Sequence, residues 1–548
     1  MSDFNQPRNG GQILVQALQA NGVDTLYCVP GESYLPVLDA LCDVPAIRTI
    51  VTRHEGAASN MADAYGKLTG RPGICFVTRG PGATHASNGV HTARQDSTPM
   101  ILFVGQVESS FKGREAFQEV DYGQMFGGLA KWVGEIDSIQ RIPEILSKAF
   151  SIALSGRPGP VVIALPEQVL FGTAQVADAP PVRIAKAVPD TSALAELRKR
   201  LATARRPLVI LGGTGWDAEG SAALRRFVHD NHLPVAASFR RQDLFDNRDP
   251  HYVGQLGLGT SPKLLQRVKD ADLLLVIGSR LSETVSQGYT LFGDQPLIHV
   301  HPDPQELNRV YHAELPILAS LSHFAVAAAQ LEPVDASTWK DWTAAARADY
   351  LEHSTPPAPH PQLAGVDMGA VMAHLNDVLP DDAIISNGAG NYTVWVHRFY
   401  RYRQPATELA PTNGAMGYGL PAAIAAKLHA PQRTVVCFAG DGCFMMYPQE
   451  LATAMQFKAP LVVIVVNNSM LGTIRMHQER EYPGRVSATE LANPDFIGLA
   501  RAFGAHAERV ERTADFAGAF ERAQAVGVPA LIELCVDPKQ ITPQARLD

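Results

Sequence analysis

Short β-branched apolar runs alternate with longer amphipathic segments along the whole chain, and this alternation constrains the fold more than any other feature. Such runs occupy residues 73–78, 207–211 and 434–439, among others. Strands that alternate with helical segments of about 10–15 residues predict parallel sheets with helices on both faces. Pro-rich stretches at 173–190 and 353–361 separate near-equal thirds. We therefore predict an α/β protein with three doubly wound parallel-sheet domains, at residues 1–180, 190–350 and 362–548.

The charge and hydropathy patterns exclude several classes of protein. The 548 residues carry 47 Lys and Arg against 55 Asp and Glu with interspersed signs, so we expect no nucleic-acid partner. The longest apolar runs, such as 460–466, fall far short of the roughly 20 residues that cross a bilayer, and the N-terminus lacks a signal-peptide pattern. These features predict a cytoplasmic protein without a membrane segment. The six cysteines include no CxxC pair, so we expect buried thiols rather than disulfides or a zinc site.

Polar residues follow two predicted strands of the carboxyl third. The strand at 435–439 ends in Gly-Asp-Gly at 440–442, and the strand at 461–466 ends in an Asn-Asn pair whose second member, Asn468, follows Asp441 by 27 residues. In doubly wound sheets ligands bind beyond the carboxyl ends of strands. An Asp and an Asn there can chelate one Mg²⁺ and leave positions for diphosphate oxygens. A lone Gly-Asp-Gly is often only a turn, but the pairing favours a metal and diphosphate site.

This spacing resembles the diphosphate and Mg²⁺ motif of thiamine-diphosphate (ThDP) enzymes. The resemblance implies that Asp441, the side chain of Asn468 and the backbone carbonyl of Met470 bind Mg²⁺, with backbone N–H groups at a helix N-terminus binding the diphosphate. It also implies that residues 385–392 and Met416 contact the cofactor. Without the resemblance, residues 385–392 would be interpreted as a plain β–α turn, and Met416 as a side chain of the core. The cofactor-binding residues implied in this third are Ala389, Gly390, Asn391, Tyr392, Gly414, Met416, Gly440, Asp441, Gly442, Cys443, Asn468 and Met470.

A carboxylate marks a predicted strand-to-helix junction in the amino third. Glu55 follows the strand at 50–52, and the residues after it have helical periodicity. Such a carboxylate could simply complement the helix dipole. Residues 53–70 closely resemble, however, the segment that holds the ThDP-activating glutamate. The resemblance implies that Glu55 hydrogen-bonds the aminopyrimidine and controls cofactor deprotonation, while the cofactor acts as the electron sink.

The amino third resembles one branch of these enzymes, the acetolactate synthase catalytic subunits. The similar segments are residues 28–41, 78–100 and 114–132, and residues 493–505 continue the match near the C-terminus. The resemblance implies roles for a loop glycine, a substrate-side Phe-Gln pair and a lysine. These residues are Gly82, Phe117, Gln118 and Lys131.

Three positions depart from the synthase pattern. Glu32 stands where the synthase typically has a glycine; it is either an acid beside the cofactor or a helix-first-turn carboxylate. His85 replaces an Asn, and His477 replaces a Trp that shapes the acceptor pocket. These two histidines, like His54 and His91, could shuttle protons near neutrality, although a structural role is the simpler interpretation of each. The catalytic candidates are Glu55, Gln118, Glu32, His85, Phe117 and Lys131.

The central third carries a weaker signal. The strand at 207–211 precedes a glycine turn, and Gly213, Gly215 and Arg280 match positions that can hold FAD or an ADP group in the resembled family, or nothing. Residues 254–265 lack the His-Gly pair of the synthase's flavin loop. FAD is therefore a possible cofactor, but we favour a central domain without it.

The leading hypothesis is a ThDP- and Mg²⁺-dependent carboligase, similar to acetolactate synthase, that decarboxylates a 2-oxoacid such as pyruvate and joins the enamine to a second carbonyl compound. The alternative is a ThDP-dependent 2-oxoacid decarboxylase or a 2-hydroxyketone (benzaldehyde-type) lyase. A catalytically silent subunit and a nicotinamide dehydrogenase are disfavoured. The resemblance implies small 2-oxoacid or aldehyde substrates and a homodimer or dimer of dimers with shared active sites.

Overall fold

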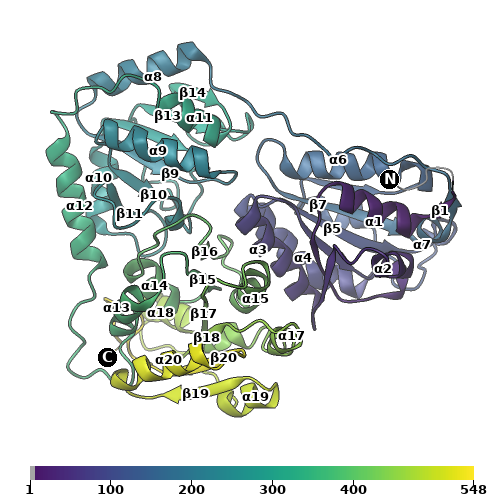
Figure 1. The fold of residues 1–548 in the computed structure, drawn as a ribbon. Coiled ribbons are helices and arrows are strands. Elements are labelled where there is room, and N and C mark those ends of the chain that lie inside the picture. The colour runs from purple at the N-terminus through teal and green to yellow at the C-terminus, as the bar shows by residue number, and fades with distance from the viewer. Residues whose placement is uncertain (1–5, 548) are drawn as a thin grey trace. The chain divides into compact units, whose positions relative to one another are not determined.

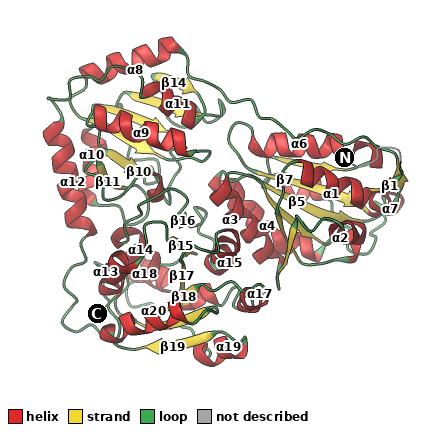
Figure 2. Ribbon diagram, viewed as in Figure 1, coloured by secondary structure: helices red, strands yellow, loops and turns green. Residues whose placement is uncertain are grey.

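The computed structural model describes residues 6–547, which contain three six-stranded parallel sheets (Figures 1 and 2). The prediction of an α/β protein with three parallel sheets is confirmed. The domain boundaries at 180–190 and 350–362 stay predictions. Among the helices of residues 6–547, none combines the length and the apolar character that crossing a membrane requires.

The first sheet has the strand order β3-β2-β4-β5-β7-β6. Every residue of β5 and β7 is buried, as expected for central strands of a parallel sheet. A two-stranded antiparallel ribbon pairs β1 (Arg8–Asn9) with β8 (Thr173–Ala174). The strands are β2 (Thr25–Cys28), β3 (Arg48–Val51), β4 (Gly73–Val77), β5 (Met100–Gln106), β6 (Trp132–Glu135) and β7 (Pro160–Pro166). The helices are α1 (Gly10–Ala20), α2 (Leu35–Cys42), α3 (Glu55–Thr69), α4 (Pro81–Asp96), α5 (Tyr122–Phe126), α6 (Ile142–Leu154) and α7 (Glu167–Phe171).

The second sheet, of order β11-β10-β9-β12-β13-β14, shows why its central strand β9 is apolar at every position. Val209 and Leu211 of β9 pack into one core, and Leu208 and Ile210 pack into another, because successive side chains of a strand point to opposite faces. The strands are β9 (Pro207–Leu211), β10 (Val235–Ala237), β11 (Tyr252–Gln255), β12 (Leu273–Ile277), β13 (Leu297–His301) and β14 (Leu315–Leu318). The helices are α8 (Thr191–Thr203), α9 (Ala218–Asp230), α10 (Pro262–Asp270), α11 (Leu321–Ala328) and α12 (Lys340–Ser354).

The third sheet has the order β16-β15-β17-β18-β20-β19. Gly440 of β17 pairs with Val466 of β18, so these two strands end at the same edge. The strands are β15 (Ile384–Asn387), β16 (Glu408–Leu409), β17 (Val435–Gly440), β18 (Val462–Asn467), β19 (His506–Val510) and β20 (Ala530–Cys535). The helices of this region are α13 (Met368–Val378), α14 (Tyr392–Phe399), α15 (Gly419–His429), α16 (Asp441–Phe444), α17 (Glu450–Gln456), α18 (Gly472–Glu481), α19 (Phe496–Ala502) and α20 (Phe516–Ala525).

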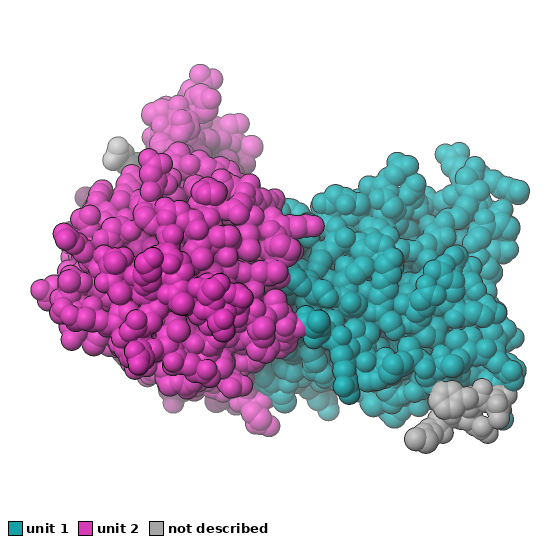
Figure 3. Space-filling view, turned by 90° about the horizontal axis from the view of Figure 1, so that it is seen from above, with its two compact units in different colours: residues 1–185, 411–431, 447–460 teal, residues 186–410, 432–446, 461–548 magenta. Residues whose placement is uncertain are grey.

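The chain forms two compact units that are not continuous in sequence (Figure 3). Unit 1 comprises residues 1–185, 411–431 and 447–460, and unit 2 comprises residues 186–410, 432–446 and 461–548. Helices α15 and α17 of the carboxyl third therefore belong with the first sheet. Among the cysteines, Cys42 is exposed and Cys535 is partly exposed; the expectation of buried thiols is wrong for Cys42, which ends α2 at the surface.

Candidate active site

Glu55 is the first residue of α3 and directly follows the loop after β3 in unit 1. Its side chain is 14% exposed, and its Oε2 lies 2.9 Å from Nδ1 of His85. The other oxygen, Oε1, faces Gly82 near the start of α4, where an added Cβ would lie 3.5 Å from it. One carboxylate oxygen is thus held by an imidazole, and the other borders bare backbone.

The histidines of the amino third do not all lie at this carboxylate. The rings of His54 and His85 stack with their centroids 4.5 Å apart, and His54 Nδ1 accepts a hydrogen bond from the N–H of Gly56. Burial first, and the neighbouring His85 second, lower the pKa of His54, so this ring is neutral at pH 7. His91 instead lies 3.1 Å from the side-chain amide of Asn413. His477, in unit 2, contacts Arg480 on the exposed helix α18.

A buried carboxylate that the sequence analysis did not identify holds the backbone leading to Glu55. Glu450, in α17, accepts hydrogen bonds from the N–H of Arg53 at 3.1 and 3.3 Å and from the hydroxyl of Thr453 at 2.6 Å. Burial raises the pKa of Glu450 to about 7. In the sequence, a Glu in the first turn of a helix indicates only a favourable interaction with the helix dipole. Its partner at Arg53 could not be inferred from local pattern.

The loop that carries Met416 is fixed to α3 and α4 by a buried polar cluster within unit 1. Lys67 forms ion pairs with Asp63, at 3.0 Å, and with Asp96. Asp63 accepts a hydrogen bond from the hydroxyl of Tyr418 at 2.7 Å, and Asp96 accepts one from the N–H of Thr412 at 2.8 Å. The two ends of the Met416 loop are therefore bound to the helix that begins at Glu55 and to the end of α4.

Glycines shape this loop. Gly414 and Gly417 have φ of +71° and +82°, a left-handed conformation that other residues adopt only at a cost. Met416, between them, is partly buried. Unit 1 therefore places Glu55 and Gly82 together at the starts of α3 and α4, whereas the loop with Gly414 and Met416 is bound further along α3 and at the end of α4.

Glu32, Phe117 and Gln118 lie at the surface or along loops. Glu32 is 67% exposed and lies 3.5 Å from Arg79, which also pairs with Glu167. Phe117 is 73% exposed. Gln118 has a φ of +63° and contacts Gly80, where a Cβ would lie 2.8 Å from its own. A substrate role for these three residues stays a prediction.

The hydrogen bonds of Lys131 give it a structural role that does not require a substrate. Its ammonium group donates hydrogen bonds to the carbonyls of Ile152, Ser155 and Arg157 at 2.6, 2.8 and 2.8 Å. Two of these carbonyls lie at the C-terminal end of α6, where unpaired carbonyls favour a cation. The structure thus gives Lys131 a helix-capping position, and its predicted role in catalysis is untested.

Asp441 follows β17 in unit 2 and opens α16. Its Oδ1 accepts a hydrogen bond from the N–H of Gly442 at 2.9 Å, and its Oδ2 accepts one from the side-chain amide of Asn493 at 2.8 Å. The same Asn493 amide donates to Oδ1 of Asn467 at 3.0 Å. Asn493, which the sequence analysis did not identify as a site residue, therefore connects the ends of β17 and β18.

The residues around Asp441 fit a magnesium ion. Burial is the main cause that raises the pKa of Asp441, and backbone N–H groups of Ser469 and Met470 oppose it. Within residues 6–547 no basic side chain forms an ion pair with this carboxylate. A carboxylate, the amide oxygen of Asn468 and a backbone carbonyl are the hard oxygen ligands that Mg²⁺ takes.

Tyr392 holds the predicted diphosphate loops together. Its hydroxyl donates to Sγ of Cys443 at 3.4 Å and accepts from the N–H of Gly388 at 3.0 Å. Its ring packs on Gly440, where a Cβ would lie 3.1 Å from it, and on Gly390, which has a φ of +145°. Unit 2 thus brings the loop between β15 and α14 against the junction of β17 and α16.

Asn391 points toward another segment. Its Oδ1 accepts a hydrogen bond from the hydroxyl of Thr473 at 2.9 Å, and its amide donates to the carbonyl of Gly472 at 3.3 Å. Both partners lie in the first turn of α18. Asn391 therefore links the predicted diphosphate loop to the helix that follows Met470.

In the turn after β9 of the second sheet, the backbone conformation itself requires glycine. Gly213 and Gly215 have φ of +78° and +84°, and a Cβ on Gly213 would lie 2.8 Å from the carbonyl oxygen of Gly278. These glycines are explained by the turn itself. FAD at Gly213, Gly215 and Arg280 stays a prediction.

Comparison with known proteins gives three family matches. They are the thiamine pyrophosphate enzyme N-terminal TPP binding domain at residues 8–125, the central domain at 194–328 and the C-terminal TPP binding domain at 388–534. Acetolactate synthase isozyme 2 large subunit of Escherichia coli is 32% identical over 532 residues, 96% of each chain. A probable acetolactate synthase large subunit of Methanocaldococcus jannaschii is 31% identical over 551 residues, 97% of this chain and 93% of its own.

Proposed function

The chain belongs to the thiamine pyrophosphate enzyme family, and we propose that it is a ThDP- and Mg²⁺-dependent carboligase. It would decarboxylate a 2-oxoacid such as pyruvate and join the remaining fragment to a second carbonyl compound. The proposal rests on two half-sites, each within its own unit: the carboxylate of Glu55 in unit 1, which contacts His85 through Oε2, and the buried carboxylate of Asp441 in unit 2. The acetolactate synthase names of relatives that cover nearly the whole chain support the reaction type.

Each half-site has a distinct task. Bound ThDP supplies a carbon nucleophile and accepts the electrons that decarboxylation releases. Glu55 would contact the aminopyrimidine through Oε1, because Oε2 is engaged by His85. Asp441, Asn468 and the carbonyl of Met470 would hold Mg²⁺. The N–H groups of Gly442 and Cys443 at the start of α16 would bind the diphosphate.

The arrangement also implies an assembly. The residues proposed for the aminopyrimidine and those proposed for the diphosphate lie in different compact units. We expect the active protein to be at least a homodimer in which two chains share each site. Light scattering checks this, and an active monomer would contradict it.

A decarboxylase or 2-hydroxyketone lyase is the second candidate. The observation that favours it is the His54 and His85 pair beside Glu55, in which His85 is half exposed and His54 is neutral. A proton donor at that position would favour release of an aldehyde over joining to an acceptor.

The test incubates the protein with ThDP, Mg²⁺ and a panel of 2-oxoacids and aldehydes, and identifies the products by NMR. Acetolactate from pyruvate supports the carboligase, and acetaldehyde or benzaldehyde supports the second candidate. Glu55→Gln is the control, and it should lose most product while binding ThDP and staying folded. Absence of any product from protein that binds ThDP would overturn both candidates.

A further inference from the structure

Three histidines and one aspartate gather beside the second sheet, and none of them belongs to the proposed active site. His229 lies in the last turn of α9, and His232 follows in the turn after it. Asp249 and His251 lie in the loop that enters β11. The ring centroids of His229 and His251 are 4.6 Å apart, and those of His232 and His251 are 5.8 Å apart.

Asp249 is the centre of this cluster. Its Oδ2 lies 2.6 Å from Nε2 of His229, and its Oδ1 lies 3.0 Å from Nδ1 of His251. The three ligand atoms, one from each residue, lie within 4.8 Å of one another. Two imidazole nitrogens and a carboxylate oxygen therefore lie near one another, with each imidazole contacting a different oxygen of Asp249.

These separations are close to those of a tetrahedral metal site. Nitrogen and oxygen ligands at about 2.0–2.2 Å from Zn²⁺ lie about 3.3 Å from one another. The observed nitrogen-to-oxygen distances, 2.6 Å to Oδ2 and 3.0 Å to Oδ1 of Asp249, are shorter by less than about 1 Å, and the separations among one ligand atom from each residue do not exceed 4.8 Å. Side-chain rotation alone can supply a movement of this size.

The cluster is held on one side and open on the other. The side chains of Asp249 and His251 are only 9% and 10% exposed, whereas that of His229 is 43% exposed. The backbone N–H of His251 donates to Oδ1 of Asp249 at 2.9 Å, which fixes the carboxylate. Two ligands are thus preorganised, and the third faces the solvent from which an ion would enter.

We propose that Nε2 of His229, Nδ1 of His251 and a carboxylate oxygen of Asp249 bind one divalent transition-metal ion, with water completing its coordination. Zn²⁺ fits this donor set, because imidazole suits zinc and the later first-row metals, whereas Mg²⁺ prefers oxygen ligands. The site is separate in chemistry from the all-oxygen site proposed at Asp441.

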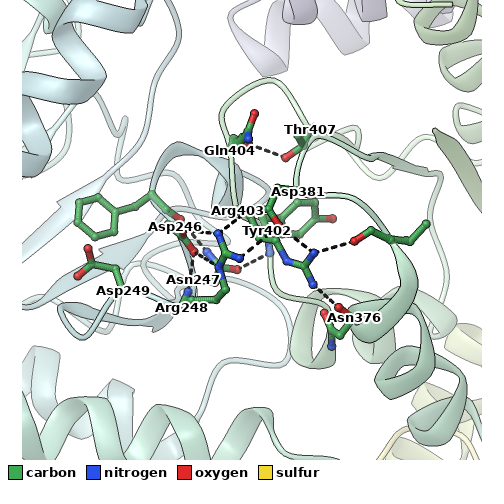
Figure 4. A network of polar contacts seen from close by, with 12 residues as sticks. Asp246, Asn247, Arg248, Asp249, Asn376, Asp381, Tyr402, Arg403, Gln404 and Thr407 are labelled. Atoms are coloured by element: carbon green, nitrogen blue, oxygen red, sulfur yellow. Dashed lines mark hydrogen bonds and ion pairs between the residues drawn. The ribbon is translucent and has the colours of Figure 1, made fainter. Parts of the chain in front are cut away.

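The site would join α9 to the loop before β11. This loop also contacts residues that lie beside strands β15 and β16 of the third sheet, all within unit 2. Next to Asp249, Arg248 pairs with Asp381 at 2.9 Å (Figure 4). The N–H of Asn247 donates to the carbonyl of Tyr402 at 2.8 Å, and the N–H of Tyr402 donates to the side-chain Oδ1 of Asn247 at 3.0 Å. Asp381 lies just before β15. A bound ion would therefore stiffen the contact on which the segment before the proposed diphosphate loop rests.

The experiment titrates Zn²⁺ into EDTA-stripped, full-length protein by calorimetry, with Mg²⁺ in excess to fill oxygen sites. It is done in a His85→Gln background, because His54, Glu55 and His85 form another cluster of potential ligands. We expect one Zn²⁺ per chain, at least tenfold weaker binding after His229→Gln, and no change after His312→Gln, which replaces an exposed histidine elsewhere.

A spectroscopic readout guards against misfolding of the variant. Co²⁺ should give a visible d–d absorption in the parent protein that disappears in His229→Gln, while the circular dichroism spectra of the two stay the same. Zn²⁺ should also raise the melting temperature of the parent protein only. Equal Zn²⁺ affinity with and without His229, or no binding by the parent, would overturn the proposal.

Discussion

The buried carboxylate of Glu450 should make the protein less stable as the pH rises, and Glu450→Gln should remove this dependence. The amide keeps the size of the side chain; its oxygen can accept from the N–H of Arg53, and its NH₂ group can donate to the hydroxyl of Thr453. What the substitution removes is the charge. Glu450 is fully buried, so that charge is costly.

The magnitude follows from the pKa. A pKa of about 7 in the folded protein, against an ordinary value of 4.5, favours the protonated form on folding by a factor of about 300, or about 3 kcal/mol. Because the pKa of Glu450 is raised, its contribution is fully present below pH 4.5 and is lost as the pH rises through 7. Between pH 5 and pH 8 the free energy of unfolding should fall by about 2.5 kcal/mol relative to Glu450→Gln.

Reversible urea unfolding at several pH values between 5 and 8 measures this difference. Glu511→Gln is the matched control, because it makes the same chemical change at an exposed position. A gap between wild type and Glu450→Gln that stays constant from pH 5 to pH 8 would refute the reasoning.

Three further substitutions separate structural from cofactor roles. Lys131→Met should lower the free energy of unfolding, measured in urea, by about 2–3 kcal/mol, because the ammonium group of Lys131 binds three carbonyls. The KM for the substrate should not change; a large rise in KM at unchanged stability would instead assign Lys131 to substrate binding. Asp441→Asn should abolish Mg²⁺-dependent ThDP binding in calorimetry with an unchanged circular dichroism spectrum, and retained binding would remove Asp441 from the metal site. Gly82→Ala, which places a methyl group 3.5 Å from Oε1 of Glu55, should weaken ThDP binding while the protein stays folded; wild-type affinity would show that this space is not used.

The sequence predicted those features that local pattern determines. The parallel sheets were predictable because strands covered on both faces must be apolar at every position, as β9 is. The positions of Glu55 and Asp441 after strands followed from the rule that sites lie at the carboxyl ends of parallel strands. Both residues do lie there in the structure.

The features that the sequence did not predict depend on contacts between distant residues. Glu450 bonds the backbone of Arg53 across 397 positions of sequence, and Asn493 bonds Asp441 across 52. No periodicity records such a pairing. Lys131 shows the same dependence on distant residues, because a helix C-terminus 21 positions away supplies carbonyl partners that the family resemblance, which implied a substrate role, does not indicate.

The composition of unit 1 has a consequence for how the chain folds during its synthesis. Residues 411–431 and 447–460 complete a unit whose other part ends at Ala185. At about 5–20 residues per second, translation needs about 10–45 s to cover the intervening stretch. Throughout that interval Asp63 and Asp96 lack Tyr418 and Thr412, and the side of α3 that packs against α15 stays exposed. Unit 1 is therefore completed only after residues 186–410 of unit 2 have been synthesised.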